Sequence, residues 1–427
     1  MKMRKTGVLL AIPVLVLAGC RNSGEAEGSG EISAPGVSSD PCPNAVNEDN
    51  GCIYLGQISD LTQGPFAPLG VPITDSIKAF WQQVNEDGGI GGYDIDAETY
   101  IRDNLYNPET QSQVYGEIEP DVLAIAQTLG SPTTAAILED LKSDEVLAVP
   151  ASWTSAWEFE DNIMESGAPY CMEAMNAVDF AVDKSDAKSV MSIGFEGDYG
   201  GDSAGGVEAA AEANGMDYEN IETVPGESEQ EGAISAILKS QPDLVVLAVG
   251  PTETAVIVGE TAARGYQGQF IGIGPTWNPA LLETPAAKAL EQLYVHSGPW
   301  ENFSGDTPGH QAMRDALGDV TPSDGYTAGW VWSYPMKAAL ETWLEGDFSK
   351  DRAGLIEAAA SLETVDYEGM LPEEAGNFSG EPNETVFRET VLEEVDPDAP
   401  TGMTQIEDFT AGPNASDYEF TESCYGG

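Results

Sequence analysis

The chain has 427 residues and a formal net charge of −56, which results from 73 acidic and only 17 basic side chains. Such a charge repels nucleic acids and anionic membrane surfaces, so we expect neither as a partner. The hydrophobic content of 41% and the 8 Trp, 15 Tyr and 12 Phe residues exclude a chain that is disordered throughout. We therefore expect a folded, halophilic protein with a strongly acidic surface. Such a surface indicates adaptation to a salty medium, because salt ions screen the repulsion between the acidic side chains.

The first 20 residues have the pattern of an export signal. A basic start precedes a short apolar run, and the segment ends in the letters LAGC, with the cysteine at position 20. Small residues directly before a cysteine resemble the bacterial lipobox, so we expect residues 1–20 to be a lipoprotein signal peptide and Cys20 to be lipidated. An ordinary signal peptide with a chance cysteine is the alternative. Residues 21–49 are rich in Gly, Ser, Pro and acidic residues, which predicts a flexible acidic tether to the extracytoplasmic face of the cell membrane.

Four cysteines remain beyond the lipobox, an even number in an exported chain. They predict two disulfides, for which three connectivities are possible, with free buried thiols as the alternative. We favour Cys42–Cys52, because this pair closes a short loop, and this choice leaves Cys171–Cys424.

From Ile53 onward, apolar strand-like runs alternate with segments of helical periodicity. The strand-like runs span 52–59, 96–102, 121–127, 146–151, 189–196, 243–250, 269–275 and 293–298. The helical segments span 72–87, 133–143, 202–215, 230–241 and 252–265. This alternation predicts an α/β fold with parallel sheets built from βαβ units. The units are too many for one small sheet, so we expect two lobes.

Short polar or aromatic turns follow several of the predicted strands. They read LGSPTT, PASWTS, GDYGGD, VGPTET and GPTWNP. In open α/β sheets, ligands bind beyond the carboxyl ends of the strands, so these turns are candidates to line one cleft between two lobes. The alternative is that each turn only caps the helix that follows it.

The sequence contains no recognisable catalytic set. Its two histidines, His296 and His310, have no metal-ligand spacing, and no Cys/His cluster resembles a zinc site. The glycine pattern of a dinucleotide loop and the P-loop are both missing. We therefore expect a protein that is no enzyme and that uses no metal and no cofactor.

Seven segments of the chain occur in the order found in one known family. They include ISDLTQGPFAPLG, VNEDGGIGGYDIDAETYIRDNLYNPETQ, LGSPTTAAILEDL and VPASWTSAWEF, and they end with DGYTAGWVWSYPMKAALETW. From about Ile53 to about Phe387, the chain resembles the branched-chain amino-acid (Leu/Ile/Val) binding proteins of ABC importers. The resemblance implies the type I periplasmic binding fold, in which two doubly wound parallel-sheet lobes are joined by three hinge crossings and close over a ligand. On this chain the crossings are expected near Cys171, Ser297 and Val386.

This resemblance also implies the organisation and the partners of the chain. After the signal peptide and the tether, we expect lobe 1 at 50–171 and 297–385, and lobe 2 at 172–296 and 386–427, the last with the C-terminal tail. The implied function is that of a monomeric binding protein, which captures a small polar solute (an amino acid, an amide or a short carboxylate) and delivers it to ABC permease subunits. A ligand-sensing module for a separate membrane receptor is the alternative.

The family's ligand contacts map onto the turns. Ser131 matches a serine that, with backbone N–H groups at a helix start, holds the α-carboxylate of an amino acid, and Thr133 lies beside it. Tyr199 matches an aromatic residue of the second lobe. The remaining expected ligand-binding positions are Leu69, Ala151, Thr154 or Ser152, Thr252, Thr276 and Trp277.

One departure from the family concerns the acidic residue that pairs with the ligand ammonium. Its position falls at Thr276 or Trp277, and burying an ammonium without a carboxylate is unfavourable unless Glu253 takes that place. We therefore favour a neutral or carboxylate-bearing solute, held by hydroxyls and stacked on Trp277, Trp153 and Tyr199. The alternative for the two tryptophans is a purely structural role.

Overall fold

The computed structural model describes residue 32 and residues 34–426 of the chain. The predicted signal peptide, the lipidation site Cys20 and the first part of the tether lie outside these residues. Within the described part, no helix combines the length and the apolar character that a membrane span needs.

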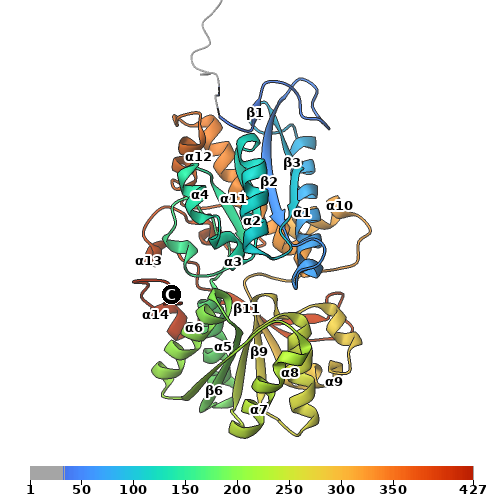
Figure 1. The fold of residues 1–427 in the computed structure, drawn as a ribbon, viewed down its shortest axis with the longest axis vertical. Coiled ribbons are helices and arrows are strands. Elements are labelled where there is room, and N and C mark those ends of the chain that lie inside the picture. Colours follow the sequence, from blue (N-terminus) through green and yellow to red (C-terminus); the bar gives the residue numbers. More distant parts are fainter. Residues whose placement is uncertain (1–31, 33, 427) are drawn as a thin grey trace, which may run out of the picture. The chain divides into compact units, whose positions relative to one another are not determined.

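The first lobe is built on a five-stranded sheet in the order β1-β2-β4-β5, with β3 paired to β2. All its pairings are parallel except that of β1 with β2. The strands are β1 (Val37–Ser38), β2 (Gly51–Ser59), β3 (Tyr93–Asp103), β4 (Ala124–Leu129) and β5 (Ala148–Ala151). The helices are α1 (Ala67–Glu86), α2 (Pro108–Ile118), α3 (Ser131–Ala135), α4 (Leu138–Ser143), α10 (Pro308–Leu317), α11 (Asp324–Glu345) and α12 (Arg352–Ala359). Helices α1 and α11, which are far apart in sequence, pack against each other, so both chain segments of this lobe share one core (Figure 1).

Residues 37–49 are packed on this lobe, although their composition predicts a flexible tether. Val37 and Ser38 pair with β2, and Cys42 is disulfide-bonded to Cys52. The Asp94 carboxylate of β3 also accepts hydrogen bonds from backbone N–H groups of the segment. The tether expectation for 21–49 is therefore corrected for these residues, because tertiary bonds that composition does not reveal hold them in place.

The second lobe has a seven-stranded sheet in the order β12-β11-β10-β9-β8-β6-β7. Strands β6 to β10 pair in parallel, whereas β11 and β12 are antiparallel additions at one edge. The strands are β6 (Ser189–Phe195), β7 (Asp217–Thr223), β8 (Leu244–Ala248), β9 (Gln269–Ile273), β10 (Tyr294–Gly298), β11 (Thr390–Val395) and β12 (Met403–Thr410). The helices are α5 (Tyr170–Ser185), α6 (Asp198–Asn214), α7 (Glu231–Ser240), α8 (Pro251–Ala263), α9 (Ala287–Leu293) and α14 (Pro413–Asp417). Both lobes are doubly wound α/β units, as predicted.

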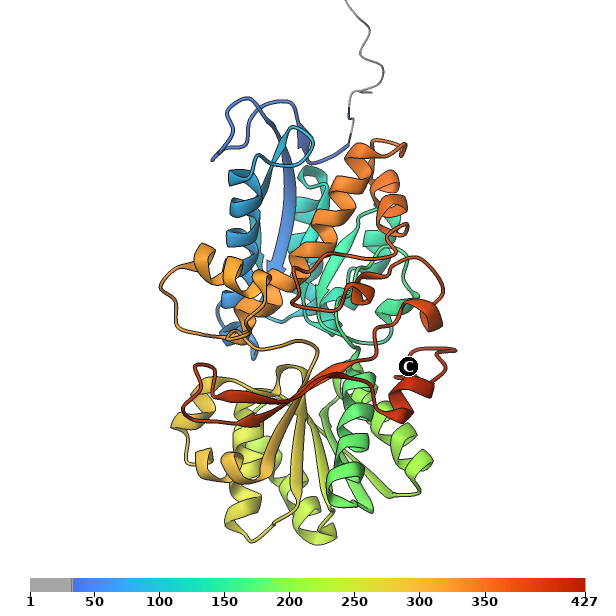
Figure 2. The same ribbon diagram turned by 180° about the vertical axis from the view of Figure 1, so that it is seen from behind.

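The chain passes between the lobes three times. It crosses between β5 and α5, between β10 and α10, and between α13 (Pro382–Thr385) and β11. Figure 2 shows the last of these segments, in red, returning from the upper lobe to complete the lower sheet. These three segments form the hinge region, where side chains from both lobes meet.

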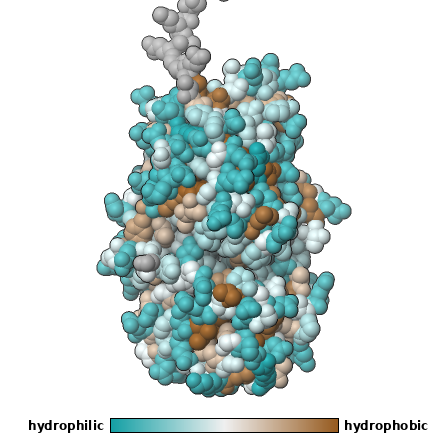
Figure 3. All heavy atoms as spheres, viewed as in Figure 1, coloured by the Kyte–Doolittle hydropathy of each residue, from teal (hydrophilic) through white to brown (hydrophobic). Residues whose placement is uncertain are grey.

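The two disulfides have the predicted pairing. Cys42 is joined to Cys52, and Cys171 is joined to Cys424, so the alternative of free thiols is wrong for this structure. The second bond connects the start of α5, next to the first crossing, to the end of the chain. Hydrophilic residues cover most of the face drawn in Figure 3, in keeping with the acidic composition.

Candidate ligand-binding site

A cavity of about 100 Å³ lies between the two lobes. The first lobe contributes side chains from α1, from the ends of β4 and β5, and from α11. The second lobe contributes Tyr170, Tyr199 and residues at the ends of β9 and β10. Because both lobes supply the walls, the complete cavity exists only when the lobes are together.

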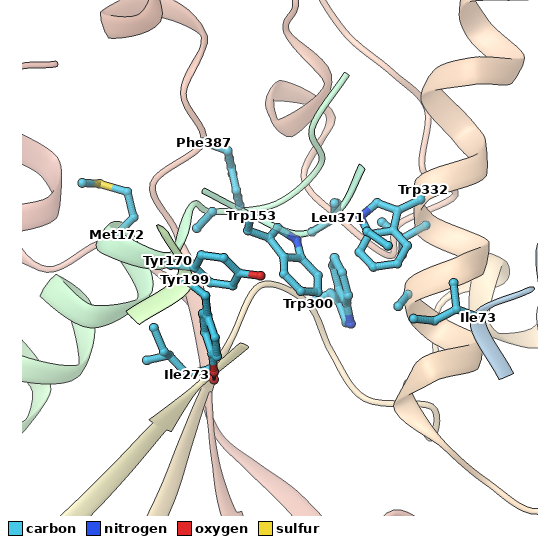
Figure 4. Close-up of a cluster of buried hydrophobic side chains, with 14 of the residues drawn as sticks. Ile73, Trp153, Tyr170, Met172, Tyr199, Ile273, Trp300, Trp332, Leu371 and Phe387 are labelled. Carbon is cyan, nitrogen blue, oxygen red and sulfur yellow. Dashed lines mark hydrogen bonds between the residues drawn. The ribbon is translucent and has the colours of Figure 1, made fainter. Parts of the chain in front are cut away.

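Aromatic rings form the middle of the cavity. The ring centroid of Trp153 lies 5.1 Å from that of Trp300 and 5.0 Å from that of Trp332, and these two are 5.4 Å apart. Tyr170 packs edge-on against Trp153 and lies 4.6 Å from Tyr199 (Figure 4). Trp153 is anchored by its indole N–H, which donates to the Ser166 carbonyl at 3.1 Å. The lining therefore suits an apolar or aromatic body.

One end of the cavity is formed by the turn that begins α3. Gly130, at φ 97°, has room for no side chain, since a Cβ there would collide with the Tyr106 ring. The next residue, Ser131, lines the cavity. Burial raises the pKa of Asp198 from the second lobe, and hydrogen bonds from the Tyr199 N–H and from the Ser131 side chain oppose that rise. A carboxylate of the protein itself therefore stands at the serine that the resemblance assigns to a ligand carboxylate.

A second polar part of the lining, called the Glu393 end below, consists of His296, Asn302, Asp324 and Glu393. His296 of β10 and Glu393 of β11 are register partners, and their Nδ1 and Oε2 atoms are 3.6 Å apart. Asn302 Nδ2 donates to Glu393 Oε1 at 2.6 Å, and Asp324 Oδ1 accepts from the Phe303 N–H at 2.9 Å. Two carboxyl groups, an imidazole and an amide thus line one wall of the cavity.

These groups shift one another's pKa values. Burial, followed by the charge of Glu393, raises the pKa of Asp324 to about 7. Burial lowers the pKa of His296, but the neighbouring Glu393 carboxylate raises it, and the net shift is upward. The charge of Glu393 therefore influences the protonation of both Asp324 and His296.

Four of the predicted ligand-binding residues line the cavity, namely Leu69, Ser131, Ala151 and Tyr199, and so does Trp153. The Tyr199 hydroxyl donates to the Ile273 carbonyl at 3.1 Å, so its ring rather than its hydroxyl is available.

The structure does not bring the other six predicted residues to the cavity. Thr133 Oγ1 caps the turn by donating to the carbonyls of Leu129 and Gly130. Ser152 Oγ accepts from the Trp157 indole, and Thr154 Oγ1 accepts from the Ala156 N–H. Thr252 lines an open groove between α7, α8 and the start of α1, and this groove shares Leu69 with the cavity.

Thr276 and Trp277 pack inside the second lobe. Thr276 Oγ1 bonds the Tyr294 hydroxyl, and the Trp277 indole stacks on the Tyr294 ring and donates to the Thr401 carbonyl at 2.9 Å. Glu253 Oε1 accepts from the Gly226 N–H at 2.7 Å and does not line the cavity. The expected stacking of a ligand on Trp277 is therefore replaced by a structural role.

Several cavity residues are absent from the sequence-based set. Trp300 and Asn302 follow shortly after β10. The rule that ligands bind at the carboxyl ends of strands therefore predicts both positions, although the sequence analysis did not name them. Asp324 and Trp332 come from a helix whose apolar pattern indicates only a core element. Glu393 lies on β11, a strand that the sequence analysis did not predict, and no local signal identifies it.

Comparisons with known proteins agree with this architecture. A profile described as periplasmic binding protein matches residues 53–397. The solved "Fatty acid ABC transporter substrate-binding protein from Thermomonospora curvata" is similar at a TM-score of 0.81 and 28% identity, covering 90% of this chain and 96% of that one. None of the curated proteins matches the chain in sequence.

Two further structures share the fold at lower identity. A branched-chain amino acid ABC transporter protein from Thermus thermophilus with bound valine has a TM-score of 0.74 at 14% identity, covering 86% of this chain and 98% of that one. A leucine binding protein from Thermotoga maritima has a TM-score of 0.69 at 16% identity, covering 85% and 99%. The chain belongs to the periplasmic binding proteins of the type I fold, a family of non-enzymatic solute-binding proteins that work outside the cytoplasmic membrane.

Proposed function

We propose that the chain is the substrate-binding protein of an ABC importer, and that it captures a small solute with an apolar body. The observation that carries this proposal is the cavity between the lobes, whose walls come from both lobes and consist largely of aromatic and aliphatic side chains. A solute that contacts both lobes favours the closed form, because only that form makes all the contacts. The permease then recognises the closed form and receives the solute.

The lining supports a revised view of the solute. Hydroxyl groups were expected to hold a polar molecule, but Thr133, Ser152, Thr154 and Thr276 are engaged elsewhere. The similar protein from Thermomonospora curvata is titled a fatty acid binder, which fits an apolar body. A cavity of about 100 Å³ has room for a body of the size of an isobutyl group, and it shares Leu69 with a larger open groove. We propose that Leu69, Ser131, Ala151, Trp153 and Tyr199 contact this body.

A thermal-shift series on the mature chain tests the proposal. Isoamyl alcohol, isoamylamine, isovalerate and leucine share an isobutyl group, whereas glycine and glycerol lack it. Ligand binding stabilises the native state by RT ln(1 + [L]/Kd), so a micromolar binder at millimolar concentration adds about 4 kcal/mol. We expect stabilisation by at least one isobutyl compound and by neither control. If none of the isobutyl compounds stabilises the chain, the proposed solute is wrong.

A transport assay links binding to import. Deleting the gene in the host should reduce uptake of the solute that binds, and the wild-type chain should restore it. The Trp300→Ala chain, which lacks a cavity wall, should not restore uptake, whereas Phe159→Ala should, because Phe159 is 40% exposed and does not line the cavity. Normal uptake without the gene would contradict a role in import.

We also propose that Cys20 is lipidated and that this lipid holds the protein on the outer face of the membrane. The letters LAGC at the end of the signal sequence support this proposal. A Cys20→Ser chain should appear in the medium or remain unprocessed. A processed Cys20→Ser chain that stays with the membrane would contradict lipid anchoring.

Adaptation to salt is a further expectation of the acidic composition. With 73 acidic side chains against 17 basic ones, screening should relieve repulsion in the native state. The melting temperature should rise as KCl is increased from millimolar to molar concentration. A melting temperature that does not depend on salt would reject this idea.

A further inference from the structure

The polar atoms at the Glu393 end of the cavity are not all satisfied. Glu393 is 3% exposed, and Asn302 uses only its Oε1 atom. No described residue donates a hydrogen bond to Oε2, whose nearest basic atom is His296 Nδ1 at 3.6 Å. A carboxylate oxygen that is buried, lines a cavity and lacks a donor has acceptor capacity available to a ligand.

His296 lies beside this free acceptor. Its Nε2 lies 2.9 Å from the Gly274 carbonyl, which can only accept, so Nε2 carries a proton. Nδ1 has no hydrogen-bond partner within the described part of the chain and lies 3.6 Å from Glu393 Oε2. The Glu393 carboxylate raises the pKa of the imidazole, but at this distance Nδ1 makes no hydrogen bond to Oε2, which keeps its acceptor capacity.

Asp324 adds a second acceptor. Its Oδ1 accepts from the Phe303 N–H, and no described donor reaches its Oδ2. Asp324 lines the same cavity as Glu393 and His296. Burial and the charge of Glu393 raise the pKa of Asp324, so a second negative charge is unfavourable at this wall unless a cation balances it.

The Ser131 end of the cavity disfavours an anion. The Asp198 carboxylate lies near the Ser131 hydroxyl, which opposes the rise that burial causes in its pKa, so a carboxylate of the solute would meet a like charge there. No lysine or arginine is among the described residues that line the cavity. A solute with a carboxylate head would therefore find repulsion at one end and no permanent cation at the other.

We propose that the solute is a primary alkylammonium compound, whose charged head binds Glu393 and Asp324 and whose apolar body packs among the tryptophans. An ammonium group has three N–H donors, and Glu393 Oε2 and Asp324 Oδ2 are acceptors that receive no hydrogen bond from the described residues. The inference rests on the proposed function, since it names the class of solute for the same cavity. The acid for an ammonium that is missing at Thr276 and Trp277 is thus supplied from the hinge side.

An isosteric ligand series tests this inference by calorimetry on the mature wild-type chain. Isoamylamine, isoamyl alcohol and isovalerate share one carbon skeleton and differ only in a positive, neutral or negative head. We expect isoamylamine to bind on the order of tenfold or more tighter than isoamyl alcohol, because charge-assisted hydrogen bonds are involved. Isovalerate should bind more weakly than the alcohol, and leucine more weakly than the amine.

Glu393→Gln is the matching variant, with Glu394→Gln as its control. The amide introduced by Glu393→Gln would keep an oxygen for Asn302 but lose the charge, whereas Glu394 is the exposed neighbour on the same strand. Glu393→Gln should weaken isoamylamine binding about tenfold and leave isoamyl alcohol unchanged, while Glu394→Gln should change neither. Melting curves of both variants show whether they fold. If a variant does not fold, the ligand series on the wild-type chain still tests the inference.

The outcomes separate the inference from the proposed function. If the alcohol binds as tightly as the amine, or isovalerate binds tightest, the ammonium inference is overturned while the binding function stands. If no member of the series binds, the inference fails together with the proposed solute. Equal loss of amine and alcohol binding in a folded Glu393→Gln chain would assign Glu393 a structural role and overturn its contact with the ammonium.

Discussion

The two ends of the cavity both contain carboxyl groups, but these groups differ in what surrounds them. At the Ser131 end, Asp198 receives the Tyr199 N–H at 3.0 Å and interacts with the Ser131 hydroxyl. At the Glu393 end, one oxygen of Glu393 and one of Asp324 receive no hydrogen bond from the described residues. The difference shows that hydrogen-bond partners, more than burial, separate a structural carboxyl group from one that is available to a ligand.

Asp202 is an example of a buried carboxyl group with a purely structural role. Its two oxygens accept from the Ser155 hydroxyl, the Ser155 N–H and the Cys171 N–H. Burial raises the pKa of Asp202 to about 7, yet no oxygen is left for a ligand. It connects the first crossing to α6, and therefore holds the hinge rather than the solute.

The largest expected effect comes from removing a ring of the aromatic cluster that lines the cavity. Trp153 is 7% exposed and contacts Tyr170, Trp300 and Trp332. Trp153→Ala should lower the free energy of unfolding by about 3–5 kcal/mol, as measured by denaturant titration. The control Phe159→Ala, at an exposed position, should change it by less than about 0.5 kcal/mol. A decrease in the free energy of unfolding below about 1 kcal/mol in Trp153→Ala would mean that other contacts, and not Trp153, stabilise this region.

The next effect concerns pH and the structural carboxyl group. Because the pKa of Asp202 is raised to about 7 in the folded state, its contribution to stability is full below pH 4 and is lost as pH rises through 7. Asp202→Asn keeps acceptors for the two N–H groups and removes the titration. The stability difference between pH 5 and pH 8 should therefore be smaller in this variant, on the order of 2 kcal/mol. An unchanged difference would assign the pH dependence to other groups.

A smaller effect is expected from neutralising the Ser131 end. Asp198→Asn removes the carboxylate that faces Ser131, so isovalerate and leucine should bind about fivefold more tightly, on the order of 1 kcal/mol. Calorimetry on both chains measures this change, with isoamyl alcohol as the neutral control. No gain for either anion-bearing compound would show that the Ser131 end does not select against carboxylates.

The smallest effect is expected at Ser131 itself. If its hydroxyl serves Asp198 rather than the solute, Ser131→Ala should change isoamylamine affinity by less than about twofold. The same titration on Glu393→Gln gives the contrasting large effect. A tenfold loss of isoamylamine affinity in Ser131→Ala would instead mean that the polar head of the solute binds at Ser131 rather than at Glu393.

Local sequence patterns were sufficient to predict the fold class and the turns that form part of the cavity wall. Alternating strands and helices predicted two parallel-sheet lobes, and the cysteines predicted the disulfide pairing that the structure shows. Ser131 and Tyr199 lie in turns that follow buried parallel strands, and the family resemblance identified these two residues within the turns. Edge strands were missed, since β7 and β12 are largely polar and exposed and lack an apolar run.

Trp277 and Trp300 show what only the tertiary structure decided. Each follows a parallel strand by a few residues, β9 in one case and β10 in the other, so the local pattern is nearly the same. Trp277 packs on Tyr294 within the second lobe, whereas Trp300 enters the cavity, because the chain after β10 crosses to the first lobe. The sequence by itself determined the acidic character, through its composition, and the α/β class, through its alternating strand and helix patterns. The acidic wall depended on β11 returning from the third crossing to place Glu393 beside His296, a pairing between residues nearly a hundred positions apart that no local pattern contains.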